Sequence, residues 1–218
     1  MTIEVYAFPP SPRAFKVMAV ANHLGLDWTM RMLDLTKGEQ RKPEYVALNP
    51  NMRMPTLKDG DYVLWESDAI LQYLAGKKPQ SGLLPTDETG RLNVTRWQFW
   101  DMCHWDPACA IFLFENVVKA VVLKSGEPDQ AALEKGAEQF HRAAKVLDQQ
   151  LKRSEFVAGD RLTVADFSIA APLNYAAMAK LPLEPYGQIG RWYGTLRALP
   201  AWQKTLAQCA PPAAAAAA

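Results

Sequence analysis

The chain has 218 residues, and its 49% hydrophobic and 22% charged content is typical of a soluble globular protein with one large or two small domains. Its 24 basic and 23 acidic residues give a net charge of +1, which excludes the strongly basic surface that binds nucleic acid. No apolar run is long enough to span a membrane, and the start MTIEVYAF lacks the basic residues that open a secretory signal. We therefore expect a cytoplasmic protein whose partners include neither nucleic acid nor a membrane.

Strand and helix patterns alternate through the first part of the chain. Residues 3–7 form a short run of strand-forming side chains, and Ser11-Pro12 then supplies the N-cap and first-turn proline of a helix that ends at Gly25. Residues 28–32 alternate between apolar and polar side chains, which predicts a second strand. Residues 43–48 fit one short helix.

The stretch NPNMRMPTLKDGDYVLWESDAILQYL, residues 49–74, predicts a turn, a hairpin and a capped helix. Its first three residues favour a turn. A strand that opens at Met54-Pro55 leaves backbone groups near Met54 unpaired, because proline cannot donate to a sheet. Asp59-Gly60 then predicts a hairpin turn, with residues 62–65 as the returning antiparallel strand.

The end of this stretch predicts a helix start. Glu66, Ser67 and Asp68 precede apolar residues at helical spacing, as an N-cap and an acidic first turn do. Such a start presents free N–H groups that can bind a carboxylate. The order strand, helix, strand, helix, strand, strand, helix predicts a thioredoxin-like α/β domain, a small mixed sheet flanked by helices.

The rest of the chain is helical in pattern. Pro, Gly and Ser cluster around residues 79–87, where we place a linker between a thioredoxin-like domain, residues 1–78, and an all-α domain, residues 88–210. Pro107 should kink the first helix of the second domain, because it removes a backbone hydrogen bond. The tail 211–218, PPAAAAAA, has low complexity and is left out of the fold argument. Helical segments are expected at residues 88–124, 129–151, 164–178 and 189–206.

The three cysteines, Cys103, Cys109 and Cys209, contain no CxxC pair. Along a helix the first two would lie ~9 Å apart at ~1.5 Å per residue, which is too far for a disulfide bond. We expect all three to be reduced, and to serve packing more than reactivity. The three histidines have no companions at metal-ligand spacing, so no metal site is expected.

Three segments together resemble the glutathione transferases. They are residues 49–74, with NP, MP, a hairpin and ESDAI; residues 6–17, YAFPPSPRAFKV; and residues 156–170, FVAGDRLTVADFSIA. The resemblance implies the cytosolic transferase architecture, a homodimer, glutathione as co-substrate and no metal. Within the family the chain is similar to serine-type bacterial members, theta-like or nu-like, and the residues do not decide between them.

By this resemblance Ser11 matches the family's catalytic serine or threonine. Its hydroxyl would donate to the glutathione sulfur and hold it as a thiolate, with the helix start at Pro12 adding partial positive charge. Helix capping alone also explains the Ser-Pro pattern. Arg13 stands where some bacterial and fungal relatives have an asparagine that contacts sulfur. It could aid the thiolate, bind a carboxylate or face solvent.

The resemblance implies that Met54, before a cis proline at Pro55, pairs its backbone with the cysteinyl part of glutathione, as a sheet edge pairs with an added strand. Glu66 would bind the γ-glutamyl ammonium, and Ser67 would give its hydroxyl and N–H to the adjacent carboxylate. Without the resemblance, Glu66 and Ser67 are explained as ordinary helix-start residues.

The glycine end of glutathione is expected near Arg53 and Gln40. Many relatives have histidine where this chain has Gln40. Lys42 is a nearby substitute, or a solvated surface charge. Thr163 and Asp166 form a capping-box pattern, which the resemblance also treats as a folding motif of the helical domain.

The electrophile pocket is expected between the domains, with Phe8, His104, Trp105 and Phe112 as candidate lining residues. An aromatic stripe at helical spacing more often packs in a core. The leading hypothesis is therefore a glutathione transferase that conjugates glutathione to a small hydrophobic electrophile. The alternatives are a glutathione-dependent peroxidase or disulfide reductase on the same fold, and a glutathione- or ligand-binding protein without catalysis.

Overall fold

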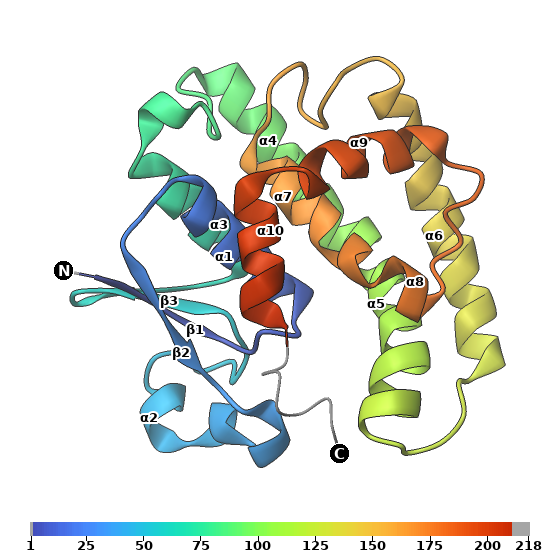
Figure 1. Ribbon diagram of the computed structural model, residues 1–218, viewed down its shortest axis with the longest axis horizontal. Coiled ribbons are helices and arrows are strands. Elements are labelled where there is room, and N and C mark those ends of the chain that lie inside the picture. Colours follow the sequence, from blue (N-terminus) through green and yellow to red (C-terminus); the bar gives the residue numbers. More distant parts are fainter. Residues whose placement is uncertain (1, 211–218) are drawn as a thin grey trace. The chain divides into compact units, whose positions relative to one another are not determined.

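The computed structural model describes residues 2–210, and the low-complexity tail 211–218 lies outside the described residues. The chain packs into two compact units. The first unit runs to Ser81 and resumes at Arg197, and the second comprises Gly82–Leu196. The fold is thus an α/β unit and a helical unit, each with its own core (Figure 1).

A four-stranded sheet in the order β2-β1-β3-β4 forms the centre of the first unit. The neighbours β1 and β2 are parallel, whereas β3 is antiparallel to both β1 and β4. Met30 and Met32 of the edge strand β2 are exposed, because the strand has a partner on one side only and little of it is covered. The strands are β1 (Ile3–Ala7), β2 (Trp28–Met32), β3 (Thr56–Asp59) and β4 (Tyr62–Trp65), as the sequence predicts.

The sheet of the first unit is covered by helices that begin where the sequence signals predict. Figure 1 shows α2 across the sheet from α1 and α3. Buried side chains from β1, α1, β3 and α3, such as Val5, Phe15, Leu57 and Ile70, form the core. The helices are α1 (Pro12–His23), α2 (Pro43–Val46) and α3 (Ser67–Gly76), with 3-10 turns at Leu35–Lys37, Glu39–Arg41 and Pro79–Ser81.

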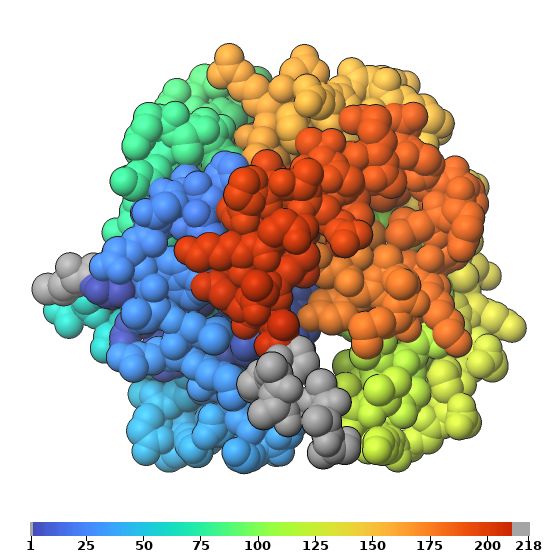
Figure 2. All heavy atoms as spheres, in the orientation of Figure 1, coloured from blue at the N-terminus to red at the C-terminus, as the bar shows by residue number. Residues whose placement is uncertain are grey.

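The last helix of the chain packs with the first unit. The sequence pattern predicted one helix over residues 189–206, but Pro200 begins a new helix, so that the segment divides into α9 (Gly187–Arg197) and α10 (Pro200–Cys209). The ring centroids of Trp202 and Phe15 of α1 lie 4.8 Å apart. Figure 2 shows the red atoms of α10 directly against blue atoms of the first unit. Sequence alone placed this helix in the second domain, whereas its buried tryptophan packs it onto α1.

A long helical segment runs through the second unit with two changes of pitch. It comprises α4 (Glu88–Trp100), a π-helical turn at Asp101–Trp105, α5 (Asp106–Leu113) and a second π-helical segment at Phe114–Val122. Pro107, where the sequence predicts a kink, lies in the first turn of α5, directly after the wider π-helical turn. The helix α6 (Gln130–Leu151) lies within the predicted segment 129–151, has Asp129 as its N-cap and packs against α5.

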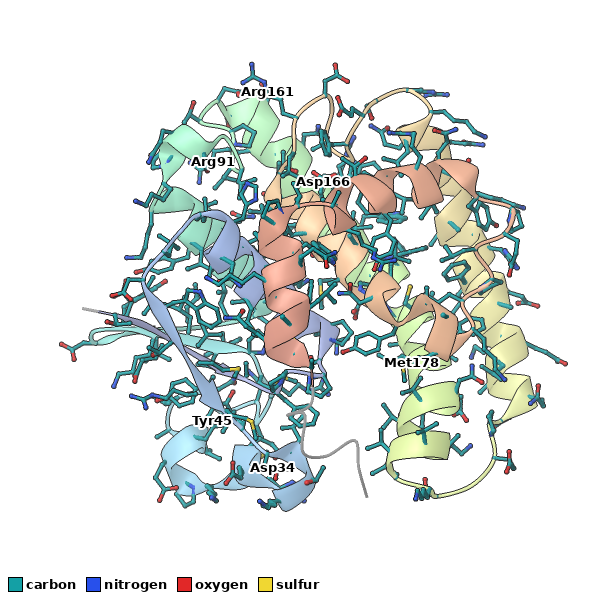
Figure 3. All side chains as sticks on the ribbon, in the orientation of Figure 1. Asp34, Tyr45, Arg91, Arg161, Asp166 and Met178 are labelled. Atoms are coloured by element: carbon teal, nitrogen blue, oxygen red, sulfur yellow. The ribbon has the colours of Figure 1, made fainter. Side chains whose placement is uncertain are left out.

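A capping box fixes the start of α7 (Val164–Ala170), as the sequence predicts. The carboxylate of Asp166, labelled in Figure 3, accepts hydrogen bonds from Thr163 N at 2.8 Å, Val157 N at 2.8 Å and Trp192 Nε1 at 2.9 Å. Burial raises the pKa of Asp166, and these donors oppose that shift. The expected helix 164–178 is shorter than predicted, because Pro172 lies in a 3-10 segment, Ala171–Tyr175, before α8 (Ala176–Ala179).

Candidate active site

Several candidate site residues lie in segments that adjoin the strands at the same edge of the sheet. Tyr6 pairs with Thr56, which also pairs with Trp65, so β1, β3 and β4 are aligned in one row across the sheet. Because β3 runs opposite to the other two, the end of β1, the start of β3 and the end of β4 share one edge. The segments after β1, before β3 and after β4 carry Ser11, Met54-Pro55 and Glu66-Ser67. Two strand spacings of ~4.8 Å separate β1 from β4, about 10 Å in all, which is the length of an extended tripeptide.

Ser11 is the N-cap of α1, yet its hydroxyl makes only a long capping contact. Its Oγ lies 3.5 Å from the Ala14 N–H, whereas the caps at Asp87 and Asp129 have contacts of 2.8 Å and 2.9 Å. Hydrogen bonds of N–H to O are normally ~2.7–3.2 Å long. The Ser11 hydroxyl is half-buried and weakly held, so it can donate to a ligand at the positive end of α1.

The start of α3 is open and its first residue is in an unusual conformation. Glu66 has a φ of 71°, which is rare for a residue other than glycine, and its side chain does not cap the helix. Residues held in such conformations occur preferentially at functional sites. Glu66 is exposed, whereas Ser67 is 4% exposed. The first turn therefore offers N–H groups, a hydroxyl and a carboxylate to one ligand.

Residues 53–55 follow a turn and enter β3. The peptide bond between Met54 and Pro55 is cis, as the resemblance implied. Arg53 is exposed, Met54 is half-buried and Pro55 is buried. The Arg53 carbonyl accepts hydrogen bonds from the Tyr45 hydroxyl at 2.5 Å and from Asn49 Nδ2 at 2.7 Å. Sequence reasoning missed Tyr45, because the pattern around residues 43–48 signalled only a short helix.

Gln40 lies in the 3-10 turn Glu39–Arg41, which belongs to the connection that leaves the C-terminal end of β2, at the same sheet edge. Among the described residues its Oε1 is buried without a hydrogen-bond partner, so the protein itself does not satisfy this side-chain oxygen. Lys42 is exposed and donates to Glu39 at 2.9 Å, which raises the pKa of Lys42. Arg13 is half-buried in the first turn of α1.

An ion pair links the two helices whose starts face this edge. Lys16 Nζ of α1 donates to Asp68 Oδ1 of α3 over 2.9 Å, and the side chains are 2% and 15% exposed. A buried pair costs desolvation energy, so it is weak support for stability. It connects two helices that pack against each other.

The four candidates for the electrophile pocket are found in different surroundings. Phe8 is half-buried in the loop after β1. Exposed His104 lines a cavity of about 470 Å³ in the second unit, together with Trp100 and Arg142. Trp105 is fully buried and donates to the Ile169 carbonyl at 2.8 Å, and Phe112 is 7% exposed beside Phe140. This burial counts against a lining role for Trp105 and Phe112.

Two of the chain's three thiols, those of Cys109 and Cys209, offer little nucleophilic capacity. All three cysteines are free. Burial raises the pKa of Cys109 well above its usual value, and nearby Asp106 and Asp101 add to the shift. Burial also raises the pKa of Cys209 to about 11. Among residues 2–210, no group of His, Cys, Asp and Glu side chains could hold a metal ion, and no helix is long and apolar enough to cross a membrane.

The fold defines a protein with a thioredoxin-like unit and a helical unit, and the start of α3 and the segment that enters β3 lie at one edge of the sheet. Comparisons with known proteins are consistent with this. Residues 1–76 match the glutathione S-transferase N-terminal domain, and residues 104–200 match the C-terminal domain of the same family. "Glutathione S-transferase 3" of Zea mays is 35% identical over 216 residues, which cover 94% of this chain and 93% of the maize protein.

Solved structures agree. A glutathione S-transferase III in apo form is 33% identical with a TM-score of 0.85, covering 97% of this chain and 99% of its own. The transferase URE2P6 of Phanerochaete chrysosporium, in complex with oxidized glutathione, is 28% identical with a TM-score of 0.85, covering 95% and 96%. The chain belongs to the glutathione S-transferase family and is a glutathione transferase. These relatives do not support the narrower prediction of a serine-type, theta-like or nu-like subclass.

Proposed function

We propose that this transferase binds glutathione along the edge of its sheet, stabilises the glutathione thiolate at Ser11 and conjugates it to a small hydrophobic electrophile. The alignment of β1, β3 and β4 carries the proposal, because it brings the three segments that we propose to bind the ligand to one sheet edge, over about the length of a tripeptide. The complex of URE2P6 with oxidized glutathione also supports glutathione as the ligand.

The chemistry requires a stabilised thiolate. A free thiol has a pKa near ~8.5 and is mostly protonated at neutral pH. The weakly held Ser11 hydroxyl would donate to the sulfur, and the start of α1 would favour its negative charge. The thiol proton passes to water. The sulfur then attacks the electrophilic carbon, a carbon–sulfur bond forms, and the leaving group departs with its electron pair.

The remainder of the tripeptide would be held by the other two segments. Glu66 is proposed to bind the γ-glutamyl ammonium, and Ser67 with the first N–H groups of α3 to bind the carboxylate. The Met54 backbone would pair with the cysteinyl part. Gln40 and Arg53 are proposed to lie near the glycine carboxylate. Arg13 is proposed to lie near the sulfur. Phe8 and His104 stay candidates for electrophile contact.

Parallel assays with glutathione and an aryl halide, an organic hydroperoxide or a small disulfide test this function. We expect turnover to be fastest with the aryl halide, measured as the absorbance of the conjugate. Faster turnover of the hydroperoxide or the disulfide would favour the peroxidase or reductase alternative. Calorimetric binding of glutathione without turnover in any assay would favour a carrier.

We also propose that the chain is a homodimer in the cytoplasm. Leu92 and Phe99 of α4 are 61% and 68% exposed, and large exposed apolar side chains are typical of interfaces. Three free cysteines fit a reducing compartment. Sedimentation velocity at micromolar concentration should give twice the chain mass, and Phe99→Asp should shift the population toward single chains. A wild-type chain that sediments as a monomer would contradict the dimer.

A further inference from the structure

A closed network of buried polar groups surrounds the backbone just before Met54. Tyr45 comes from α2, Asn49 from the turn that follows it, and Thr56 is the first residue of β3. Their exposed fractions are 4%, 3% and 0%. Figure 3 labels Tyr45 beside α2. All three side chains lie within hydrogen-bond distance of one another or of the Arg53 carbonyl.

The hydrogens of this network can be assigned one by one. Asn49 Oδ1 accepts from Asn51 N and Nδ2 at 3.0 and 3.1 Å, which fixes the orientation of the Asn49 amide. Asn49 Nδ2 then uses its two hydrogens for Arg53 O at 2.7 Å and Thr56 Oγ1 at 3.1 Å. The single hydroxyl hydrogen of Tyr45 goes to Arg53 O.

The Thr56 hydroxyl must therefore donate to Tyr45 Oη, over 2.8 Å. In this arrangement every donor is used, and both lone pairs of the Arg53 carbonyl are occupied. A fully satisfied buried network is rigid, and each of its members depends on the others. The Arg53 carbonyl consequently has one orientation, directed into the protein.

The orientation of that carbonyl determines the direction of the next N–H group. Arg53 C=O and Met54 N–H belong to one planar peptide unit, and the cis bond follows one residue later. In a trans unit these two groups point in opposite directions, so an inward carbonyl requires an outward Met54 N–H. Met54 precedes β3, and among residues 2–210 its N–H makes no turn or loop hydrogen bond.

We infer that Tyr45 is a positioning residue for glutathione, acting with Asn49 and Thr56 to hold the Met54 N–H toward the tripeptide backbone. The inference rests on the proposed role of Met54 in main-chain pairing. The conformational entropy of this peptide unit is lost on folding, so binding does not have to order it again. The network lies beneath the peptide-binding segment and acts on affinity; the thiolate is stabilised separately, at Ser11.

The test is Tyr45→Phe, which removes one hydroxyl and keeps the ring. We expect the Kd of S-hexylglutathione, a ligand without a free thiol, to rise about fivefold to tenfold, the worth of one neutral hydrogen bond. At saturating glutathione, kcat should change less than twofold at every pH, so that the shape of its pH profile is kept. The matched control is Tyr73→Phe: the Tyr73 hydroxyl donates to Asp59 at 2.9 Å, at the opposite end of β3, and its loss should leave Kd unchanged.

A second variant tests the same network if Tyr45→Phe does not fold. Thr56→Val retains the shape of Thr56 and leaves the Tyr45–Arg53 hydrogen bond, so it should raise Kd by a smaller factor, about twofold to fourfold. If the wild type binds S-hexylglutathione and both variants bind it equally tightly, the positioning role is wrong while the proposed function stands. If the wild type itself does not bind this ligand, the proposed function fails.

Discussion

Replacing Ser11 with alanine is expected to lower kcat/KM for conjugation about 10- to 100-fold at pH 6.5, which is the worth of one hydrogen bond to a charged group. Without the hydroxyl, the pKa of bound glutathione should rise toward that of the free thiol. The loss should therefore be large at pH 6.5 and small near pH 9, where the sulfur ionises without help. Rates measured against pH, together with calorimetric affinity for glutathione, report both effects.

The loss of helix stability must be distinguished from the loss of thiolate stabilisation in this experiment, since Ser11 is also the N-cap of α1. Its capping contact of 3.5 Å is weak, so the stability lost should be at the low end of the ~0.5–2 kcal/mol of an N-cap. Ser11→Thr keeps a hydroxyl and should keep most of the activity. Asp129→Ala removes the cap of α6 in the second unit and should leave the pH profile unchanged. Full conjugation activity in Ser11→Ala at pH 6.5 would remove the serine from the mechanism.

Replacing Glu66 with alanine should raise the KM for glutathione about 10- to 100-fold, with kcat at saturation changed less than threefold. The carboxylate is proposed to bind the γ-glutamyl ammonium, a charged contact remote from the reacting sulfur. Glutamate and alanine both carry a Cβ at the φ of 71°, so backbone strain is similar in the two proteins. Initial rates over a range of glutathione concentrations give the two constants.

A glutathione analogue without the α-amino group sharpens this test. The wild type should bind the analogue more weakly than glutathione. Glu66→Ala should bind the analogue as well as the wild type does, because the contact between the carboxylate and the ammonium is already absent. Asp61→Ala removes an exposed acid from the β3–β4 turn, at the other end of the hairpin, and serves as the control. Equal affinity of wild type and Glu66→Ala for glutathione itself would place the ammonium elsewhere.

The local signals of the sequence predicted where several elements begin and turn, including the start of α1 at Ser11 in the candidate site. The Ser-Pro pair marked the start of α1, Asp59-Gly60 marked the hairpin, and the Thr163–Asp166 pair marked the capping box. Each of these depends on hydrogen bonds or dihedral preferences within a few residues, so the sequence carries the whole signal. The unusual φ of Glu66 had no such signal, because it depends on how β4 enters α3.

What the sequence by itself determined, then, was the type and order of the elements and the residues at their starts. Only the tertiary structure decided that Trp105 and Phe112 are core residues, that α10 packs on α1, and that Tyr45 reaches the Arg53 carbonyl. Burial and helix packing require partners far apart in the chain. The members of the buried network are 4 to 11 residues apart, but their contacts depend on how the chain folds between α2 and β3. The pattern of neighbouring residues does not record which distant surfaces meet, because that choice is made by the packing of the whole unit.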